Sequence, residues 1–297
     1  MMRFKPLLAM VFACSALTGV ARADDDVFDS NGVKIRYVTA GEGEAVVLIH
    51  GWMGDSSMWG RDAAGNTKLD TTGSKGFQII ALDCRGHGKS DKPHDASKYG
   101  AEMAADVVRL LDHLKIKKAH LIGYSMGAFI AGKVAATHPD RVLSVIYGGQ
   151  APLIVGVPAS GSNEVEVFAK AVEEGKGLGP YLLEVMPPDK PKLTLEQANS
   201  IAKYLYGGRD VKAFALAGQS LSDLRVTADD LRKCAAPTLF IYGGNESAHT
   251  QESIAAARRV LGRGEVKVIE GGDHITTLAK PAFGASIMAF LRSHMSK

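Results

Sequence analysis

The fold is decided by the stretch Leu121-Ile122-Gly123-Tyr124-Ser125-Met126-Gly127-Ala128, in which an apolar run ends at a serine flanked by glycines. The residues before the serine have the pattern of a buried strand, and Met126 to His138 has the pattern of a helix that Pro139 ends. A serine on so tight a turn needs small residues two positions before and after it. The turn exposes the serine hydroxyl at a helix N-terminus, where the helix dipole favours negative charge. Ser125 is therefore the predicted nucleophile, the alternative being a plain strand-to-helix turn.

Outward from this turn, strands and helices alternate along the chain. Continuous apolar runs predict central parallel strands, and an alternating run predicts an antiparallel strand near a sheet edge. The continuous runs are 45–49, 77–82 and 119–122, the alternating run is 33–38, and further strands are expected at 142–147, 238–242 and 266–269. Helices are expected at 103–114, 126–138, 253–261 and 283–295. The pattern predicts an α/β fold with a mostly parallel sheet flanked by helices.

Residues 151–233 interrupt this alternation. Helical pieces at 165–174 and 195–206 are separated by glycines and prolines, and no buried-strand pattern is present. We interpret the segment as a small helical cap inserted over the carboxyl edge of the sheet, where open α/β folds bind ligands. Residues 24–150 and 234–297 would then form the core. A second independent domain is the alternative.

The N-terminus has the pattern of a secretory signal peptide. Basic Arg3 and Lys5 precede an apolar run to about Val20, and Ala21-Arg22-Ala23 is typical of a cleavage site. We therefore predict a signal peptide over residues 1–23 and a secreted or periplasmic enzyme with no stable membrane insertion after cleavage. A membrane anchor, a buried strand or a lipoprotein cysteine at Cys14 are the alternatives.

Charge and cysteine content exclude some classes of protein. The net charge is +3, from 35 basic and 32 acidic residues, and no basic block is present. This balance argues against nucleic acid or an anionic membrane as a partner. After cleavage only Cys84 and Cys234 remain, and the predicted topology places them on opposite rims of the sheet. Two free or buried thiols are therefore expected rather than a disulfide.

A serine nucleophile needs a base, which in turn needs an orienting acid. His274 is the predicted base because Gly271-Gly272-Asp273-His274 follows the last strand and so lies on the rim that carries Ser125. Glu246 is the predicted acid, being the carboxylate in the turn after strand 238–242. Asp273 and Asp223 are the alternatives. The backbone amides of Met126 and Trp52 are the predicted donors to an oxyanion.

These motifs together resemble the α/β-hydrolase superfamily, particularly its esterase and lipase-like branch. His50-Gly51-Trp52 resembles the oxyanion-loop motif, Leu82 to Ser90 a second loop signature, and Gly123 to Gly127 the nucleophile elbow. The resemblance implies that Asp83 and Arg85 stabilise their loop. It covers most of residues 26–150 and 235–297, but not the insertion. The acid in that family is usually Asp, whereas this chain has Glu246.

The predicted activity is hydrolysis of a small carboxylic ester through a covalent acyl-enzyme on Ser125. No metal or other cofactor is predicted, because the histidines lack ligand spacing. Lactonase, C–C bond hydrolase, aminopeptidase and perhydrolase activities use the same triad and stay open, as does a non-catalytic small-molecule binding protein. Serine in place of aspartate as nucleophile argues against dehalogenase or epoxide-hydrolase chemistry. Tyr181, Leu182, Leu183 and Met186 are candidates either for an acyl pocket or for the core of the cap.

Overall fold

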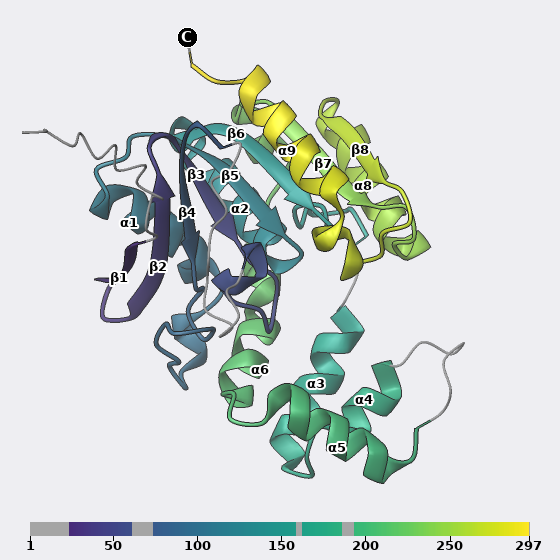
Figure 1. Ribbon diagram of the computed structural model, residues 1–297. Coiled ribbons are helices and arrows are strands. Elements are labelled where there is room, and N and C mark those ends of the chain that lie inside the picture. The colour runs from purple at the N-terminus through teal and green to yellow at the C-terminus, as the bar shows by residue number, and fades with distance from the viewer. Residues whose placement is uncertain (1–23, 61–73, 159–161, 186–192, 297) are drawn as a thin grey trace, which may run out of the picture.

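An eight-stranded sheet forms the centre of the molecule in the computed structural model, which describes residues 24–60, 74–158, 162–185 and 193–296 (Figure 1). The strand order is β1-β2-β4-β3-β5-β6-β7-β8. The strands are β1 (Asp24–Asp29), β2 (Lys34–Gly41), β3 (Gly43–Ile49), β4 (Gly76–Leu82), β5 (Ala119–Tyr124), β6 (Val142–Gly148), β7 (Thr238–Gly243) and β8 (Glu265–Ile269). β1 and β2 pair antiparallel at one edge, and the strands from β4 to β8 are parallel. The predicted sheet is confirmed.

Helices cover both faces of the sheet. One apolar cluster joins strand side chains to α1 (Ala101–His113), α2 (Met126–Thr137) and α8 (Ala248–Leu261). A second cluster joins the opposite face to α9 (Pro281–Ser293). Because alternate residues of a strand face opposite ways, Val47 and Ile49 belong to the first cluster while Val46 and Leu48 belong to the second. Burial on both faces explains why β3 is continuously apolar from Ala45 to Ile49.

Strand β1 was not predicted, because its sequence begins Asp24-Asp25-Asp26. Pairing with β2 holds it, from Asp24 opposite Thr39 to Asp29 opposite Lys34. The buried guanidinium of Arg36 donates to both carboxylate oxygens of Asp25 at 2.7 and 2.8 Å. The hydrogen bonds from Arg36 lower the pKa of the Asp25 carboxyl. A tertiary partner therefore offsets the low strand propensity of aspartate.

The inserted segment is helical in its described part. It contains α3 (Ser162–Glu174), α4 (Gly179–Val185), α5 (Leu195–Tyr206), α6 (Val211–Gln219), the 3-10 turn η4 (Ser220–Leu224) and α7 (Ala228–Lys233). The helices α3 to α6 lie together below the carboxyl ends of the strands in the view of Figure 1 and have an apolar cluster of their own. We call α3 to α6 the cap. Leu231 of α7 instead belongs to the core cluster.

Short 3-10 turns and a buried ion pair fix the loops that connect these elements. The turns are η1 (Ser56–Trp59), η2 (Ala96–Lys98), η3 (Pro139–Arg141) and η5 (Thr276–Ala279). In the predicted second loop, the buried carboxylate of Asp83 accepts from the Ser56 and Lys89 amides at 2.8 Å each. Arg85 forms a two-pronged ion pair with buried Asp106. Both arrangements agree with the loop-stabilising roles that the resemblance implies.

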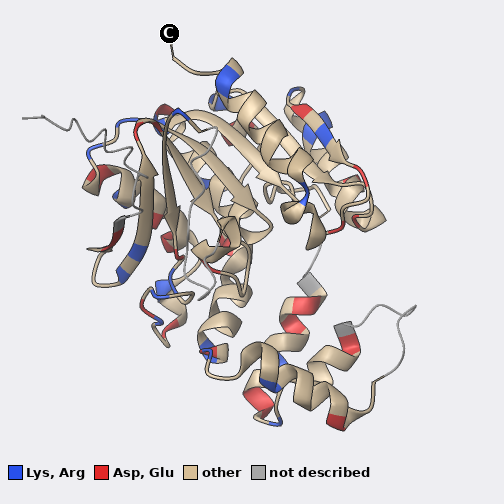
Figure 2. Cartoon of the chain, in the orientation of Figure 1, with Lys and Arg blue, Asp and Glu red and all other residues tan. Residues whose placement is uncertain are grey.

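Several features of the molecule relate to the remaining predictions. Cys84 and Cys234 are buried free thiols, as expected. Figure 2 shows basic and acidic residues interspersed with one another over the helices, strands and loops of the chain. Within the described ranges, no helix has the length and apolar character needed to span a bilayer. The predicted signal peptide, residues 1–23, lies outside the described residues.

Candidate active site

Ser125 lies on a strained turn between β5 and α2. Its φ is 55° and its ψ is −119°, in a region that side-chain-bearing residues rarely adopt. A Cβ on Gly123 would lie 2.0 Å from the Gly127 carbonyl oxygen, and one on Gly127 would lie 2.0 Å from the carbonyl oxygen of Ile49. The Ser125 amide donates to the carbonyl of Gly148 on β6 at 2.8 Å. Packing against two neighbouring strands therefore holds the strained serine in place.

The hydroxyl of Ser125 lies within hydrogen-bond distance of His274. Ser125 Oγ and His274 Nε2 are 3.0 Å apart, although 149 residues separate them in sequence. His274 follows β8 and precedes η5, so it reaches the same rim of the sheet as Ser125, as predicted. Its side chain is about one-third exposed, at 36%. The imidazole is thus open to a substrate or water while contacting the serine.

Glu246 lies behind the imidazole. His274 Nδ1 and Glu246 Oε1 are 2.9 Å apart, and only 3% of the Glu246 side chain is exposed. An ionised carboxylate accepts but cannot donate, so Nδ1 carries the proton and Nε2 is free to accept from the serine hydroxyl. Buried Glu246 therefore selects the tautomer in which His274 can act as a base toward Ser125.

The two alternative acids are engaged elsewhere. Asp273 is exposed, and its Oδ1 accepts from the amides of Ile275 and Thr276 at 2.9 and 2.7 Å. The hydrogen bonds from Thr276 lower the pKa of the Asp273 carboxyl. Asp223 packs beside Gly100 at the start of α1, where an added Cβ would lie 2.6 Å from its carboxylate. Glu246 is thus the candidate whose carboxylate reaches the base.

Tyr124 was not predicted to take part in the site. Its hydroxyl donates to the backbone carbonyl of His274 at 2.7 Å, and the two ring centroids are 5.5 Å apart. Burial, with a smaller contribution from the Glu246 charge, raises the pKa of Tyr124 far above its usual value, so the hydroxyl stays a donor. The residue before the nucleophile therefore fixes the loop that carries the base. No sequence signal indicates this, because the partner lies 150 residues away.

The two predicted oxyanion donors flank the serine. Met126 begins α2, and neither its amide nor that of Trp52 donates to a backbone carbonyl in the described loops and turns. A Cβ on Gly51 would lie 3.2 Å from Ser125 Cβ, so the loop before Trp52 passes directly over the serine. Buried His50 holds this loop, because its Nδ1 donates to the Gly51 carbonyl and its Nε2 accepts from the Cys84 amide.

Among the described residues, two cavities lie between core and cap residues. One, of about 320 Å³, is lined by Asp55 and Arg209 among others. The other, of about 440 Å³, contains Ser125. The cavity at Ser125 also contains His274, Trp52 and Met126. Its remaining walls combine apolar and polar side chains: Phe129, Leu153, Val165 and Leu221, with Gln150, Glu164, Glu166, Gln219, Ser222 and Arg225. A cavity of this volume and character is typical of a small-molecule site.

The residues proposed as a possible acyl pocket in α4 do not line this cavity. Tyr181 is buried in the cap, where its ring packs edge-on against Phe168 and its hydroxyl donates to Glu164 at 2.7 Å. Leu182 packs on the same cluster and Leu183 is exposed. Met186 lies outside the described residues. The alternative reading, that these residues belong to the core of the cap, therefore holds for Tyr181 and Leu182.

Comparison with known proteins agrees with this fold. The model of the α/β hydrolase fold family matches residues 44–176, which contain the oxyanion loop and Ser125. The chain has the α/β-hydrolase fold. An epoxide hydrolase of Caballeronia sordidicola is 29% identical to it over 274 residues, covering 92% of this chain and 77% of the relative.

Other relatives of the chain bear different names. A 2-hydroxy-6-oxononadienedioate/2-hydroxy-6-oxononatrienedioate hydrolase of Burkholderia vietnamiensis is 28% identical, covering 74% of this chain and 77% of the relative. The crystal structure of a membrane phospholipase A, a bacterial virulence factor, superposes with a TM-score of 0.64 at 26% identity. It covers 91% of this chain and 86% of its own. The α/β-hydrolase fold is thus established, and the names of the relatives span several reactions.

Replacing Glu246 tests which carboxylate orients the base. We expect Glu246→Gln to lower kcat/KM for an ester by about 1,000-fold or more, because an amide in place of the carboxylate favours the wrong tautomer of His274. Asp273→Asn is the matched control, since it keeps the Oδ1 acceptor, whose described hydrogen bonds go to the amides of Ile275 and Thr276. Steady-state kinetics of both variants measure the effect. A large loss in Asp273→Asn with Glu246→Gln unaffected would contradict the assignment.

Proposed function

We propose that the protein hydrolyses carboxylic esters through a covalent acyl-enzyme on Ser125. The observation that carries the proposal is the chain of hydrogen bonds from Ser125 through His274 to Glu246, with distances of 3.0 and 2.9 Å. A hydroxyl needs such a base to act as a nucleophile near neutral pH. The ester carbonyl would lie in the cavity beside Ser125.

The reaction follows from the placement of these groups. Ser125 Oγ attacks the carbonyl carbon while His274 Nε2 takes the hydroxyl proton, giving a tetrahedral oxyanion that accepts from the Met126 and Trp52 amides. The oxyanion collapses, the carbon–oxygen bond to the alcohol breaks, and His274 returns the proton to the departing alcohol. Water then attacks the acyl-serine with His274 again as base, releasing the acid and restoring Ser125. Glu246 stabilises the imidazolium in both halves.

The chemistry of serine favours ester substrates over epoxides, despite the name of the Caballeronia relative. Attack by a serine hydroxyl on an epoxide carbon would give an ether, which has no carbonyl for water to attack. An acyl-serine is an ester, and the same histidine and amides that formed it can hydrolyse it. Turnover therefore requires an acyl group. The name of the phospholipase A neighbour, an enzyme class that cleaves carboxylic esters, supports the same reaction.

A substrate panel tests this proposal. We expect nitrophenyl butyrate to be turned over and styrene oxide not, with lactones, nitroanilides and vinylogous 1,5-diketones included to detect the related reactions that use the same triad. Hydrolysis is followed by released nitrophenol and by chromatography of the other products. Turnover of styrene oxide, with no turnover of any ester, would contradict the proposal. Because the N-terminus predicts export of the protein, we further propose that its natural ester substrate lies outside the cytoplasm.

A further inference from the structure

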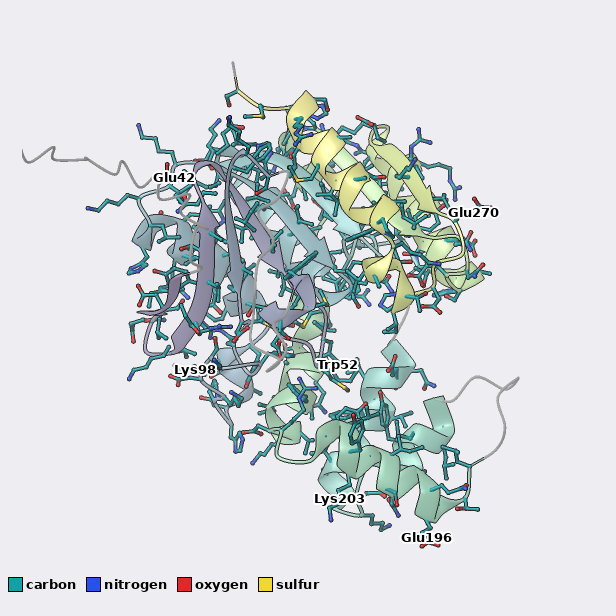
Figure 3. The ribbon with its side chains drawn as sticks, viewed as in Figure 1. Glu42, Trp52, Lys98, Glu196, Lys203 and Glu270 are labelled. Carbon is teal, nitrogen blue, oxygen red and sulfur yellow. The ribbon has the colours of Figure 1, made fainter. Side chains whose placement is uncertain are left out.

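The loop that carries the proposed oxyanion donor is attached to the cap. The indole Nε1 of Trp52 donates to the backbone carbonyl of Phe214, in α6, at 2.8 Å. The two residues are 162 positions apart, so the bond joins core to cap directly. Figure 3 shows Trp52 at the boundary between the core and the helices of the cap, whose far end carries Glu196 and Lys203.

The surroundings of the indole allow little freedom. The Phe168 ring from α3 meets it edge-on, with ring centroids 5.2 Å apart. Gly218 of α6 lies so close that an added Cβ would be 2.9 Å from Trp52 Cζ2. The helix therefore approaches the ring at the one position where it has no side chain. Two cap helices and one hydrogen bond fix the orientation of Trp52.

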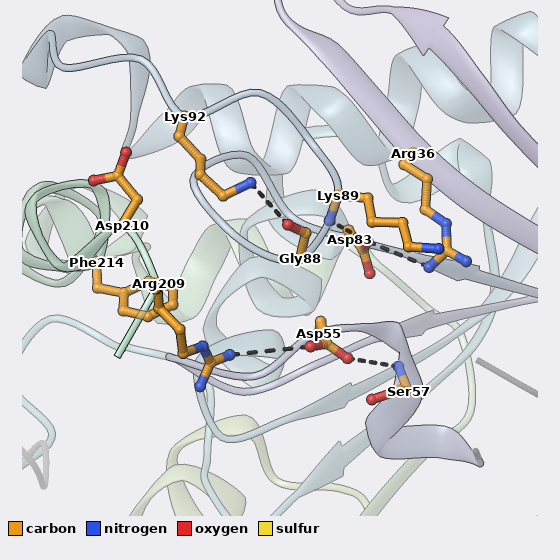
Figure 4. Close-up of a pocket in the computed structure, with 11 residues that line it drawn as sticks. Arg36, Asp55, Ser57, Asp83, Gly88, Lys89, Lys92, Arg209, Asp210 and Phe214 are labelled. Carbon is orange, nitrogen blue, oxygen red and sulfur yellow. Dashed lines mark hydrogen bonds and ion pairs between the residues drawn. The ribbon is translucent and has the colours of Figure 1, made fainter. Parts of the chain in front are cut away.

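A second attachment lies at the other end of the loop. Asp55 forms an ion pair with Arg209 at 4.0 Å and accepts from the Ser57 amide at 2.9 Å (Figure 4). The Arg209 guanidinium also lies 5.0 Å from the centre of the Phe214 ring. The ion pair is at the distance limit for such a contact, and each partner is about one-third exposed, so solvent screens it. The Trp52 bond, at 2.8 Å, is the shorter of the two attachments, and Phe214 is a contact of both.

We infer that the Trp52 side chain is a positioning residue, which uses its hydrogen bond to α6 to hold its own backbone amide at the oxyanion. The inference rests on the proposed function, because it assigns a role within that reaction. An oxyanion donor acts only when it lies at about 2.7 to 3.1 Å from the developing charge. The cap thus supports the chemical step as well as surrounding the substrate. A cap shift would alter turnover through this bond.

The experiment compares the two tryptophans of the chain. Trp52→Phe keeps an aromatic ring and removes the N–H donor. Trp59→Phe is the matched control, because the buried Trp59 Nε1 has no hydrogen-bond partner in the described structure. Active sites are counted with a fluorophosphonate, so that kcat is expressed per reactive serine. For Trp52→Phe we expect kcat to fall about tenfold, with KM nearly unchanged, as for a misplaced catalytic group. Trp59→Phe should match the unaltered enzyme.

A transition-state analogue separates positioning from folding. An alkyl trifluoromethyl ketone forms a tetrahedral oxyanion with the serine, so its Ki should rise in Trp52→Phe by the factor that kcat/KM falls. Gly218→Ala is a second variant, which keeps the N–H but pushes on the ring. It should lower kcat while the melting temperature holds, since alanine favours a helix. Unchanged kcat and Ki in both variants would overturn the inference. A fall in total activity that is explained entirely by fewer serines reacting with the fluorophosphonate would also overturn it. Absence of ester turnover in the unaltered enzyme would instead contradict the proposed function.

Discussion

Ser125→Ala is expected to lower kcat/KM for nitrophenyl butyrate by about 10⁵-fold or more, because the atom that attacks the carbonyl is removed. The variant should fold normally, because the Ser125 side chain makes no capping hydrogen bond to α2. The hydrogen bond from the backbone amide of residue 125 to the Gly148 carbonyl is also kept. Loss of the hydroxyl also leaves His274 without a nucleophile to activate, so the remaining rate should be close to that produced by binding and the oxyanion donors alone. Purity matters at this level, because a trace of contaminating esterase would mask the loss.

The matched control for this prediction is Ser286→Ala. Ser286 lies on α9, and its Oγ donates to the carbonyl of Ala282 within the same helix. Ser286 is not among the residues that line the cavity at Ser125. Both variants lose one hydroxyl, but only Ser125→Ala should lose turnover. Retained hydrolysis in pure Ser125→Ala, at a rate near that of Ser286→Ala, would place the nucleophile elsewhere.

Gly127→Ala is expected to prevent folding of the turn. The added Cβ would lie 2.0 Å from the Ile49 carbonyl oxygen and 3.0 Å from that of His50, and both are backbone atoms of the central β3 region. Neither can move without breaking the pairing of β3 with β4 and β5. A clash of this kind in the core costs more than about 4 kcal/mol, a large part of the stability of a typical domain.

Gly284→Ala provides the comparison for Gly127→Ala. Gly284 lies in α9 with nothing within 4 Å of an added Cβ, so alanine should raise stability by up to about 1 kcal/mol through helix propensity. Chemical denaturation monitored by circular dichroism measures both variants. The prediction fails if Gly127→Ala is as soluble and as stable as Gly284→Ala.

The core of the fold was predictable because its signals are local. β3 is apolar from Ala45 to Ile49, and the elbow needs glycine on both sides of the serine. Both could therefore be located without knowledge of distant contacts. His274 was predicted from its place after the last strand, since the carboxyl ends of parallel strands share a rim. In the structure, His274 Nε2 lies 3.0 Å from Ser125 Oγ, and His274 Nδ1 lies 2.9 Å from Glu246 Oε1.

The features that were missed depend on contacts between distant residues. β1 exists because Arg36 and the β2 backbone bind a segment of aspartates. The cap helices α4 and α6 are short and flanked by glycine, and α6 is held by aromatic packing of Phe214 rather than by a strong periodic pattern. The hydrogen bonds of the Tyr124 hydroxyl and of the Trp52 indole were not predicted either, because their partners lie 150 and 162 residues away. Local periodicity carries no information about such pairs.

The most direct test of the proposed mechanism is to trap its covalent intermediate. The enzyme is mixed with excess nitrophenyl acetate and quenched in acid within the first turnovers, and the peptides are analysed by mass spectrometry. The proposed mechanism predicts one acetyl group on Ser125, formed at the rate of the nitrophenol burst, and no acetyl group on the same peptide of Ser125→Ala. Rapid turnover with no acyl group on Ser125, or with the acyl group on another residue, would contradict it.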